Sequence, residues 1–474
     1  MLLRLGLLLL LTLPIAAQAT DLRIEQARLV NLRETTGTAY VLLDIGWDNA
    51  WHNDRNHDAA WVVLKLLDPE GGYRHIPIDA SGHQVVEVPG YAGPAASIQA
   101  ANDRTGFVVH PNTRYRGDVR WRLRIEIDES ALPESLGRHV LQAYGVEMVY
   151  IPEGAFALGD TDPTAYDFGA YFRSDADGQP DGLYEVTSEA EIAIGPTTSQ
   201  LYYSTGEYRG DGDGPIPAAF PKGYDAFYLM KYELRQGDYA AFLNTLPTDH
   251  AAAHFPFDTI DNYAQERGSL ERTTNRYHAK HPDRALNFAA WDDQLAWSDW
   301  MACRPPTEFE FTKAARGPEA TVGNSFPWGT ASVDGLARLM GPSGDLVMTN
   351  GWDEDQLNDA TRSVFGASFY WVMDLAGSVW ERVLSPGYPD GRAYTGSHGD
   401  GTLDAEGRAT NADWPHTYLE REGHGYRGGG FYEQGRATHE FNPYSPVSYR
   451  RFGAWAGANP SLAYGYRCAR SADG

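Results

Sequence analysis

The feature that most constrains this chain is a series of short apolar runs between residue 20 and about residue 145. RIEQARLVNL, AYVLLDIGW, AAWVVLKLLD and DVRWRLRIEID are rich in Val, Ile, Tyr and Trp, and turns containing Gly, Pro, Asn or Asp separate them. Runs of this composition and spacing are typical of the strands of a β-sandwich. We therefore expect residues 20–145 to form an all-β, sandwich-like domain.

The pattern changes from Met148 onward. The aromatic run DAFYLMKYE predicts a strand that ends before Glu233, and helices are indicated after it, separated by irregular, Gly-rich segments. The predicted fold class is therefore α+β, with little regular secondary structure in the second part. The residues that mark the helices are Tyr239, Phe242 and Leu243 in the first, Trp291, Leu295 and Trp300 in the second, and Thr307 with Glu308 at the start of the third.

Length and charge limit the classes of protein that remain. A chain of 474 residues exceeds what one hydrophobic core usually organises, and 42% hydrophobic residues are ample for burial, so we expect two domains. The 64 acidic residues outnumber the 39 basic residues and give a formal net charge of −25. Such a surface repels the phosphates of nucleic acid and of anionic lipid, and we expect no nucleic-acid partner.

The first residues, MLLRLGLLLLLTLPIAAQAT, have the pattern of a signal peptide. An early Arg precedes an apolar run, and Ala17-Gln18-Ala19 has the small-x-small pattern of a cleavage site. The alternative is a membrane anchor, but the run is too short to span a bilayer, and no later segment offers about 18 uninterrupted apolar residues. We expect removal of residues 1–19 and a secreted or periplasmic protein without a membrane span.

Two histidines interrupt the strand pattern in WDNAWHNDRNHDAAWVV. His52 and His57 stand among Asn and Asp, and both are candidate metal ligands. An ordinary polar connection before a buried strand is the favoured interpretation, because spacing in the sequence fixes no third ligand.

Only two cysteines occur, Cys303 and Cys468. In an oxidising compartment they are a candidate disulfide, and closing so long a loop contributes about 4 to 5 kcal/mol in the chain-entropy model. The sequence leaves open whether the two residues meet. Two cysteines are too few for a Cys-rich zinc site.

Seven segments, in one order, resemble the formylglycine-generating enzyme, or sulfatase-modifying factor, family. The resemblance covers roughly residues 146–474 and leaves residues 20–145 as an extra N-terminal β domain. It implies a fold related to C-type lectins, often with structural Ca²⁺, and residues from about 160 to 226 are an insertion relative to the family. The segments are VYIPEGAFALGD, FYLMKYELRQGDYAAFLN, FAAWDDQLAWSDWMACRPPTEFEFTKAARG, FPWG, DLAGSVWERV, RGGGFY and GYRCAR.

The chain departs from this family at the oxidase site. In the family, two cysteines bind copper just after a Gly-rich motif, within the segment that here reads RGGGFYEQGRATHEF. Thiolates suit Cu(I) in a way that oxygen ligands do not. Counting without gaps places Glu433 and Thr438 at these positions, and no cysteine lies between Cys303 and Cys468. We therefore assign no catalytic residue, do not expect copper, and do not expect a formylglycine-generating oxidase.

The resembled family also includes members without the cysteine pair that are non-haem iron enzymes, whose iron is held by histidines of a separate helical domain. A site of two histidines and one carboxylate is an alternative here. Two observations argue against it: the histidines near the end of the chain are irregularly spaced, and the N-terminal domain reads as all-β and shows no His-x-x-x-His-x-Glu spacing. We therefore do not expect iron. A metal-dependent oxidoreductase stays the alternative function. The residues concerned are His398, His416, His424, His439, Glu433 and Glu440.

The resemblance also implies a calcium site in DLAGSVWE. The carbonyls of Gly377 and Val379 and the carboxylate of Glu381 match a family site built from backbone oxygens and one Glu, although Ser378 replaces the usual Asn. Calcium is therefore the candidate cofactor. The arginines near the end are expected to pair internally with Asp and Glu, and the helix after Thr307 is expected to have a structural role. These arginines are Arg427, Arg450, Arg451 and Arg467.

The last fifty residues are unusually rich in Gly, aromatic residues and Arg. RGGGFY and YGYRCAR read as buried, and the loop from Glu433 to Pro460 as an exposed aromatic surface that binds a protein or a glycan. We therefore expect an exported recognition or assembly protein with an extracellular or envelope partner. A structural envelope component is a third alternative. The candidate binding residues are Tyr432, Glu433, His439, Tyr444 and Trp455.

Overall fold

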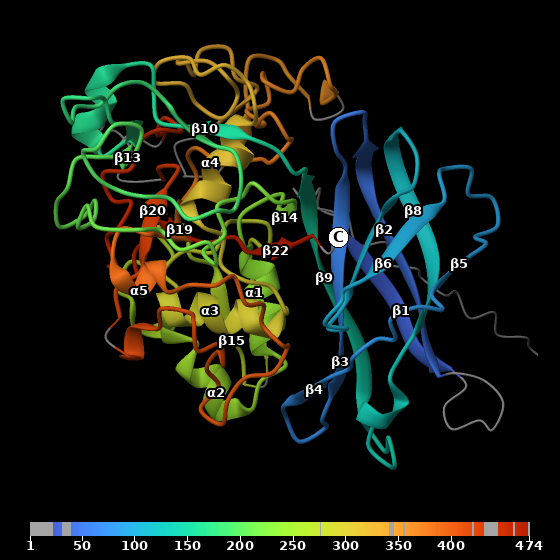
Figure 1. Ribbon diagram of the computed structural model, residues 1–474. Coiled ribbons are helices and arrows are strands. Elements are labelled where there is room, and N and C mark those ends of the chain that lie inside the picture. Colours follow the sequence, from blue (N-terminus) through green and yellow to red (C-terminus); the bar gives the residue numbers. More distant parts are fainter. Residues whose placement is uncertain are drawn as a thin grey trace, which may run out of the picture.

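The computed structural model of the protein describes residues 22–30, 39–274, 276–340, 346–353, 356–419, 421–430, 444–457 and 460–472. Figure 1 shows a regular half made of long strands on the right and, on the left, a half with few helices, short strands and long connections. The predicted signal peptide, Tyr432, Glu433 and His439 lie outside the described residues.

Two sheets form the N-terminal half. The first has the order β1-β2-β8-β5 and is entirely antiparallel. The second has the order β22-β14-β9-β3-β7-β6, with β4 paired to β3. The strands of the first sheet are β1 (Arg23–Val30), β2 (Tyr40–His52), β5 (Gln84–Val86) and β8 (Tyr115–Glu126). Those of the second are β3 (Asp58–Leu67), β4 (Tyr73–His75), β6 (Ala96–Ala100), β7 (Phe107–Pro111), β9 (Val140–Ile151), β14 (Phe227–Met230) and β22 (Ala469–Ser471).

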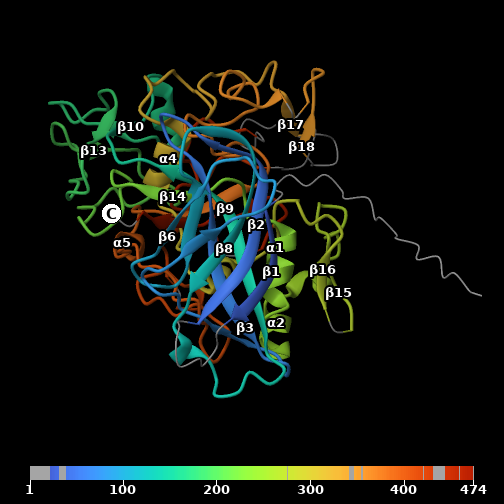
Figure 2. The same ribbon diagram turned by 90° about the vertical axis from the view of Figure 1, so that its right-hand side faces the viewer.

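The core of this half lies between the two sheets. Alternate residues of β2 and β8 point inward, as expected for strands with one buried face, and Trp47 packs edge to face on Trp121 at 5.4 Å. The same core receives Val62 and Leu64 from β3. The expected β-rich N-terminal region is thus confirmed. Figure 2 shows its strands lying across the face that is turned toward the viewer.

Strand β3 is buried on both faces. Val62 and Leu64 face the core of the sandwich, whereas Trp61 and Val63 belong to the large core of the C-terminal half. A strand covered on both sides reads as a continuous apolar run, which explains why AAWVVLKLL shows no alternation. It even buries Lys65, whose Nζ donates to the carbonyls of Trp300 at 2.6 Å and Gly401 at 2.7 Å.

Strand β9 joins the two halves. It pairs with β3 from Asp58↔Val149 to Leu67↔Val140, and its last residues also pair with β14 from Phe227↔Ile151 to Met230↔Met148. The predicted boundary between residues 145 and 146 therefore falls inside a strand. The two halves share one seven-stranded sheet instead of being joined by a linker.

The C-terminal half contains the predicted helices. Tyr239, Phe242 and Leu243 are buried on the first, and Thr307 caps the third in a capping box with Glu310. The helices are α1 (Gln236–Leu243), α2 (Thr248–Ala253), α3 (Trp291–Trp300), α4 (Glu308–Arg316) and α5 (Pro389–Arg392), with 3-10 turns at Glu129–Ala131, Pro163–Phe168, Pro256–Thr259 and Thr417–Leu419.

Short strands complete this half. β19 lies between β20 and β21. The segment 160–226 contributes one strand, β12, to the pair β10-β12 and both strands of the pair β11-β13. The strands are β10 (Phe156–Leu158), β11 (Phe172–Arg173), β12 (Tyr184–Val186), β13 (Leu201–Tyr202), β15 (Leu270–Arg272), β16 (Tyr277–Ala279), β17 (Arg338–Met340), β18 (Leu346–Met348), β19 (Trp380–Leu384), β20 (His424–Arg427) and β21 (Tyr464–Gly465). The relation of this half to C-type lectins stays a prediction.

Within the described residues, every helix is too short or too polar to cross a membrane.

Candidate functional site

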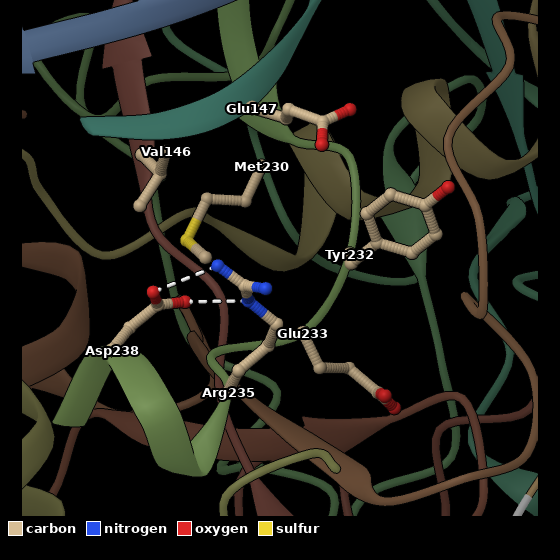
Figure 3. A pocket seen from close by; sticks show the side chains of 7 residues that line it. All are labelled: Val146, Glu147, Met230, Tyr232, Glu233, Arg235 and Asp238. Carbon is tan, nitrogen blue, oxygen red and sulfur yellow. Dashed lines mark hydrogen bonds and ion pairs between the residues drawn. The ribbon is translucent and has the colours of Figure 1, made fainter. Parts of the chain in front are cut away.

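A narrow pocket opens where β9, β14 and α1 meet. Seven residues line it, and Figure 3 shows the Arg235 guanidinium facing Asp238 while the Glu233 carboxylate points away from both. Arg235 donates from Nε to Asp238 Oδ2 and from Nη2 to Asp238 Oδ1, both at 2.9 Å. The cavity holds about one water molecule, so it does not admit a substrate. The other lining residues are Val146, Glu147, Met230 and Tyr232.

A buried ion-pair group lies beside this pocket. Lys231 Nζ donates to Glu147 Oε2 at 2.9 Å and lies 3.6 Å from Asp58 Oδ2. Burial alone would lower the pKa of Lys231, but the charge of Glu147 raises it, so the amine stays charged. Burial raises the pKa of Asp58 to about 6 against the opposing effect of Lys231. These three residues come from β3, β9 and the end of β14, and they link the two halves.

Glu233 has the most perturbed carboxyl group of the pocket. Burial raises its pKa to about 8, and the carboxylates of Asp374 and Glu381 act in the same direction, against the effect of Arg467. The backbone N–H of Val379 donates to Glu233 Oε1 at 3.1 Å. Glu233 therefore carries a proton at neutral pH, deep in the protein and away from solvent.

The predicted calcium residues lie next to Glu233. Both oxygens of Glu381 are bound by the Arg467 guanidinium, with Nη2 at 2.7 Å from Oε1 and Nε on Oε2. The Gly377 N–H donates to the Gly428 carbonyl at 3.1 Å, and the Val379 N–H points to Glu233. The three residues are thus brought together on β19 and the turn before it. Calcium binding there stays a prediction.

The predicted internal arginine pairs are present in the C-terminal half. Glu308 accepts from Arg450 Nε at 3.0 Å and from Arg427 Nη1 at 3.3 Å, and all three side chains are fully buried. Arg304 and Glu310 form a second pair, with Nη2 at 2.6 Å from Oε1. The helix after Thr307 therefore has the structural role that the sequence predicted.

Cys303 and Cys468 meet in the core of the C-terminal half. Both are fully buried free thiols in this structure. Burial raises the pKa of Cys468 well above its usual range, and a hydrogen bond with Cys303 adds to this. Both thiols therefore lack the exposure of a reactive cysteine, and the raised pKa of Cys468 disfavours its thiolate form.

The predicted binding residues separate in space. Tyr444 is only 9% exposed and packs on Phe326 and Trp328. Trp455 is partly buried and lies 5.4 Å from the ring of Tyr208. Trp455 is therefore partly exposed, whereas Tyr444 belongs to a small core, and binding by either residue stays a prediction.

The sequence offered a group of histidines as an alternative iron site. The three that the structure describes, His398, His416 and His424, do not lie together. His424 stacks on Trp291 at 4.5 Å, His398 Nε2 accepts from the Ser471 N–H at 3.0 Å, and His416 bonds the Asn411 carbonyl at 2.9 Å. Each is held by its own neighbours. The remaining members, Glu433, His439 and Glu440, lie outside the described residues.

The C-terminal half, with the last strand of the N-terminal half, corresponds to a known family of proteins. Residues 141–472 match the family model described as "Sulfatase-modifying factor enzyme 1-like domain", which is more than half of the chain. The chain belongs to this family. The match begins within β9, the strand that the two halves share.

Three relatives illustrate how far the similarity extends. The formylglycine-generating enzyme of Bos taurus is 23% identical over 194 residues, which cover 36% of this chain and 51% of the relative. That of Streptomyces coelicolor is 29% identical over 125 residues, covering 26% and 39%. The uncharacterized protein YfmG of Bacillus subtilis is 28% identical over 171 residues, covering 33% of each. The chain thus spans between a third and about half of the length of these relatives.

The sequence pointed to Glu233 only as the residue at a strand end. Its raised pKa depends on burial in the folded protein and on Asp374 and Glu381, which lie more than a hundred residues later in the chain. A Glu directly after an apolar strand was the only available signal. The exposed ring of Tyr208 was missed as well, because nothing in its local sequence links it to Trp455.

Proposed function

We propose that this protein is an exported, non-catalytic member of the family that binds a protein partner through an aromatic surface. We call this surface the aromatic patch. It consists of Phe168, Tyr208, Tyr449, Phe452 and Trp455. In this proposal the C-terminal half is a binding domain with a C-type-lectin-related fold, and residues 1–19 direct its export.

The observation that carries the proposal is the exposure of aromatic rings from two distant segments that pack on one another. Phe168 is 37% exposed and stacks on Tyr449 at 5.4 Å. Tyr208 is 38% exposed and lies 5.4 Å from Trp455 and 6.1 Å from Phe452. Phe168 and Tyr208 belong to the inserted segment, so the insertion supplies part of the patch. Exposed rings of this kind are typical of interface centres.

The patch rests on a rigid base. Phe452 packs edge to face on the buried Trp380 at 5.7 Å, and Trp455 contacts the buried Tyr426 at 5.6 Å. The guanidinium carbon of the buried Arg382 lies 5.5 Å from the centre of the Tyr426 ring. Rings that are held in place before binding lose little conformational entropy in the complex, which favours affinity.

The two cysteines support a role other than formylglycine formation. That chemistry needs a pair of thiolates that reach a substrate, whereas Cys303 and Cys468 are fully buried and the pKa of Cys468 is raised. The buried cavity beside Glu233 is also too small for a substrate.

The test compares two variants of the mature protein, one with a double and one with a single aromatic substitution. Tyr208→Ala combined with Trp455→Ala should abolish cross-linked capture of the partner by purified bait, because central aromatic side chains often carry more than about 2 kcal/mol of an interface. The unfolding free energy should fall by much less than the roughly 3 to 5 kcal/mol expected for a core ring. Tyr444→Ala is the matched control, since it should destabilise the fold and leave capture by the folded fraction intact.

Three results would contradict the proposal. If capture survives the double substitution, the aromatic patch is not the binding surface. If the protein binds a purified glycan instead of a protein, the partner belongs to another class than the one proposed. Formation of an aldehyde in a sulfatase-type cysteine peptide with added copper, detected by mass spectrometry, would restore the oxidase interpretation.

A further inference from the structure

Three histidines of the N-terminal half come together at the junction of the two halves. His52 ends β2, His57 directly precedes β3, and His110 lies in β7. Their candidate ligand atoms all lie within 4.8 Å of one another. In the described part of the chain this is the one group of three or more His, Cys, Asp or Glu side chains with such spacing.

The strand register explains why these side chains share one face of the sheet. His52 and His57 are direct partners in an antiparallel bridge across the turn that joins β2 and β3. β3 and β7 pair antiparallel with Ala60 opposite Val109. One residue further along this register, His110 lies opposite Ala59, which is two residues from His57. Diagonal positions of this kind lie on the same side of adjacent strands and bring long side chains within reach.

The tautomers of two of the rings are fixed by one backbone carbonyl. The Pro111 carbonyl lies 2.7 Å from His52 Nδ1 and 2.9 Å from His110 Nδ1. A carbonyl oxygen only accepts, so both Nδ1 atoms must carry the hydrogen. The lone pair of each ring is therefore on Nε2. A ring oriented by an Nδ1–H bond to a carbonyl, with Nε2 free to coordinate, is the arrangement typical of metal-binding histidines.

The third ring, His57, is held between aromatic neighbours. It stacks on His110 at 4.0 Å and on Tyr150 at 4.9 Å, and its Nε2 lies 3.4 Å from the Tyr228 hydroxyl. Burial lowers the pKa of His57 to about 2, with the two other histidines acting in the same direction, and burial also lowers the pKa of His110. The ring of His57 is therefore enclosed by neighbours from β7, β9 and β14.

We propose that His52, His57 and His110 form a binding site for one divalent transition-metal ion, with Zn²⁺ as the first candidate. Three imidazoles suit zinc, copper or nickel and leave one coordination position for water. Ligand nitrogens around a tetrahedral zinc are about 3.3 Å apart, given bonds of about 2.0 Å. The ligand atoms, which lie within 4.8 Å of one another, must therefore move by ring rotation to coordinate one ion. The His57 ring must turn out of its stack on His110 to coordinate.

One of the three histidines borders the surface of the protein. His52 borders a surface hollow that is also lined by Arg114, Arg116 and Asp359. Arg116 Nη2 and Asp359 Oδ1 form an ion pair at 2.9 Å across this hollow, between the N-terminal and C-terminal halves. A bound ion would join β2, β3 and β7 next to the shared sheet. It would therefore stabilise the junction, which is independent of the aromatic patch and of the function proposed for it.

The experiment uses the mature, untagged protein after removal of metal with a chelator. Titration with ZnCl₂ in a calorimeter should show one ion per chain, and CoCl₂ should give the visible absorption of a tetrahedral cobalt site with nitrogen ligands. His52→Gln and His110→Gln should each weaken zinc binding at least tenfold. His139→Gln is the matched control, because His139 also bonds a backbone carbonyl through Nδ1, that of Leu136 at 2.6 Å, in the same half but away from the group.

Stoichiometric binding that is lost in the two variants and kept in the control supports the site, and stronger binding of copper than of zinc by the same residues supports it with another resident metal. Absence of stoichiometric binding, or an affinity unchanged in both variants, overturns it. Melting curves of the metal-free variants establish that they fold. If they do not, the cobalt spectrum of the unmutated protein decides, since a spectrum of octahedral cobalt in water would overturn the site.

Discussion

In the N-terminal sandwich, ion pairs lie mostly at the surface, whereas the C-terminal half buries several arginine side chains with carboxylates. Asp44 and Arg122 pair across β2 and β8 with both side chains partly exposed. Glu308 instead meets Arg427 and Arg450 with all three fully buried. The first half is organised by apolar faces and backbone ladders, and the second by a small number of buried charged groups.

This difference follows from the backbone of each half. Long strands satisfy their own N–H and C=O groups and present one apolar face, so their core needs few polar side chains. Long irregular connections leave backbone groups without regular partners. Buried arginines meet part of that need in the C-terminal half: Arg467 donates to the carbonyls of Met230 and Met373, and Arg316 to those of Ala157 and Gly159.

The largest expected effect comes from breaking one buried ion-pair group. Glu308→Ala leaves Arg427 and Arg450 buried without their carboxylate, and we expect a loss of about 3 to 5 kcal/mol in the free energy of unfolding. Denaturant unfolding measures it. Asp44→Ala, which breaks the partly exposed pair with Arg122, should cost less than about 1 kcal/mol. Equal losses of unfolding free energy in the two variants would show that the C-terminal half does not depend more on its ion pairs than the N-terminal half does.

The second prediction concerns alkaline pH and Glu233. Its pKa of about 8 in the folded protein lies above the value of about 4.3 in an unfolded chain, so the folded state binds the proton more tightly. The resulting stability is present at low pH and is lost as the pH rises through about 8. At about 1.36 kcal/mol per pKa unit, we expect a loss on the order of 4 kcal/mol between pH 5 and pH 9.

Glu233→Gln keeps the acceptor for the Val379 N–H and removes the titration, so its stability should vary less over this range. Urea unfolding at pH 5, 7 and 9 compares the two proteins. Parallel pH profiles would contradict the raised pKa.

The third prediction has the opposite sign and belongs to the N-terminal half. The pKa of His57, about 2 in the folded protein, lies below the value of about 6.5 in an unfolded chain. The unfolded state therefore binds more protons as the pH falls below about 6.5, and stability is lost. We expect the metal-free protein to lose about 1 to 2 kcal/mol between pH 7 and pH 5.

His57→Gln should reduce this acid sensitivity without changing the alkaline loss assigned to Glu233. Thermal melts in a series of metal-free buffers separate the two effects. An unchanged acid slope in the variant would mean that other groups cause it.

The smallest expected effect is that of calcium. If Gly377, Val379 and Glu381 bind Ca²⁺, the ion should add about 1.4 kcal/mol at a free concentration ten times its dissociation constant. Glu381→Gln is not a suitable test, because it also removes the partner of the buried Arg467. The melting temperature of the unmutated protein should instead fall with a calcium chelator and recover with added Ca²⁺ but not with Mg²⁺. A melting temperature that changes neither with the chelator nor with added Ca²⁺ would reject the site.

Local sequence patterns were sufficient for many elements of both halves. The apolar runs predicted β2, β3 and β8, and apolar spacing with the cap at Thr307 predicted α1, α3 and α4. These features depend on neighbours within a few residues, which the sequence displays directly. The family could also be inferred, because its segments occur in one order along the chain.

The boundary of the two halves could not be inferred in the same way. The composition changes near residue 146, but β9 continues from Val140 to Ile151 because β3 pairs with most of its length and β14 with its end. Pairing with partners that lie about eighty residues away on either side decides where the strand begins and ends.

By itself, the sequence determined the β-rich N-terminal region, the principal helices, the family and the lack of a cysteine pair for copper. Only the tertiary structure decided which side chains meet. It placed His110 beside His52 and His57, Tyr208 beside Trp455, and Asp374 and Glu381 beside Glu233. The physical reason is that spacing along the chain sets the face on which a side chain lies, whereas strand register and packing between distant segments set its neighbours.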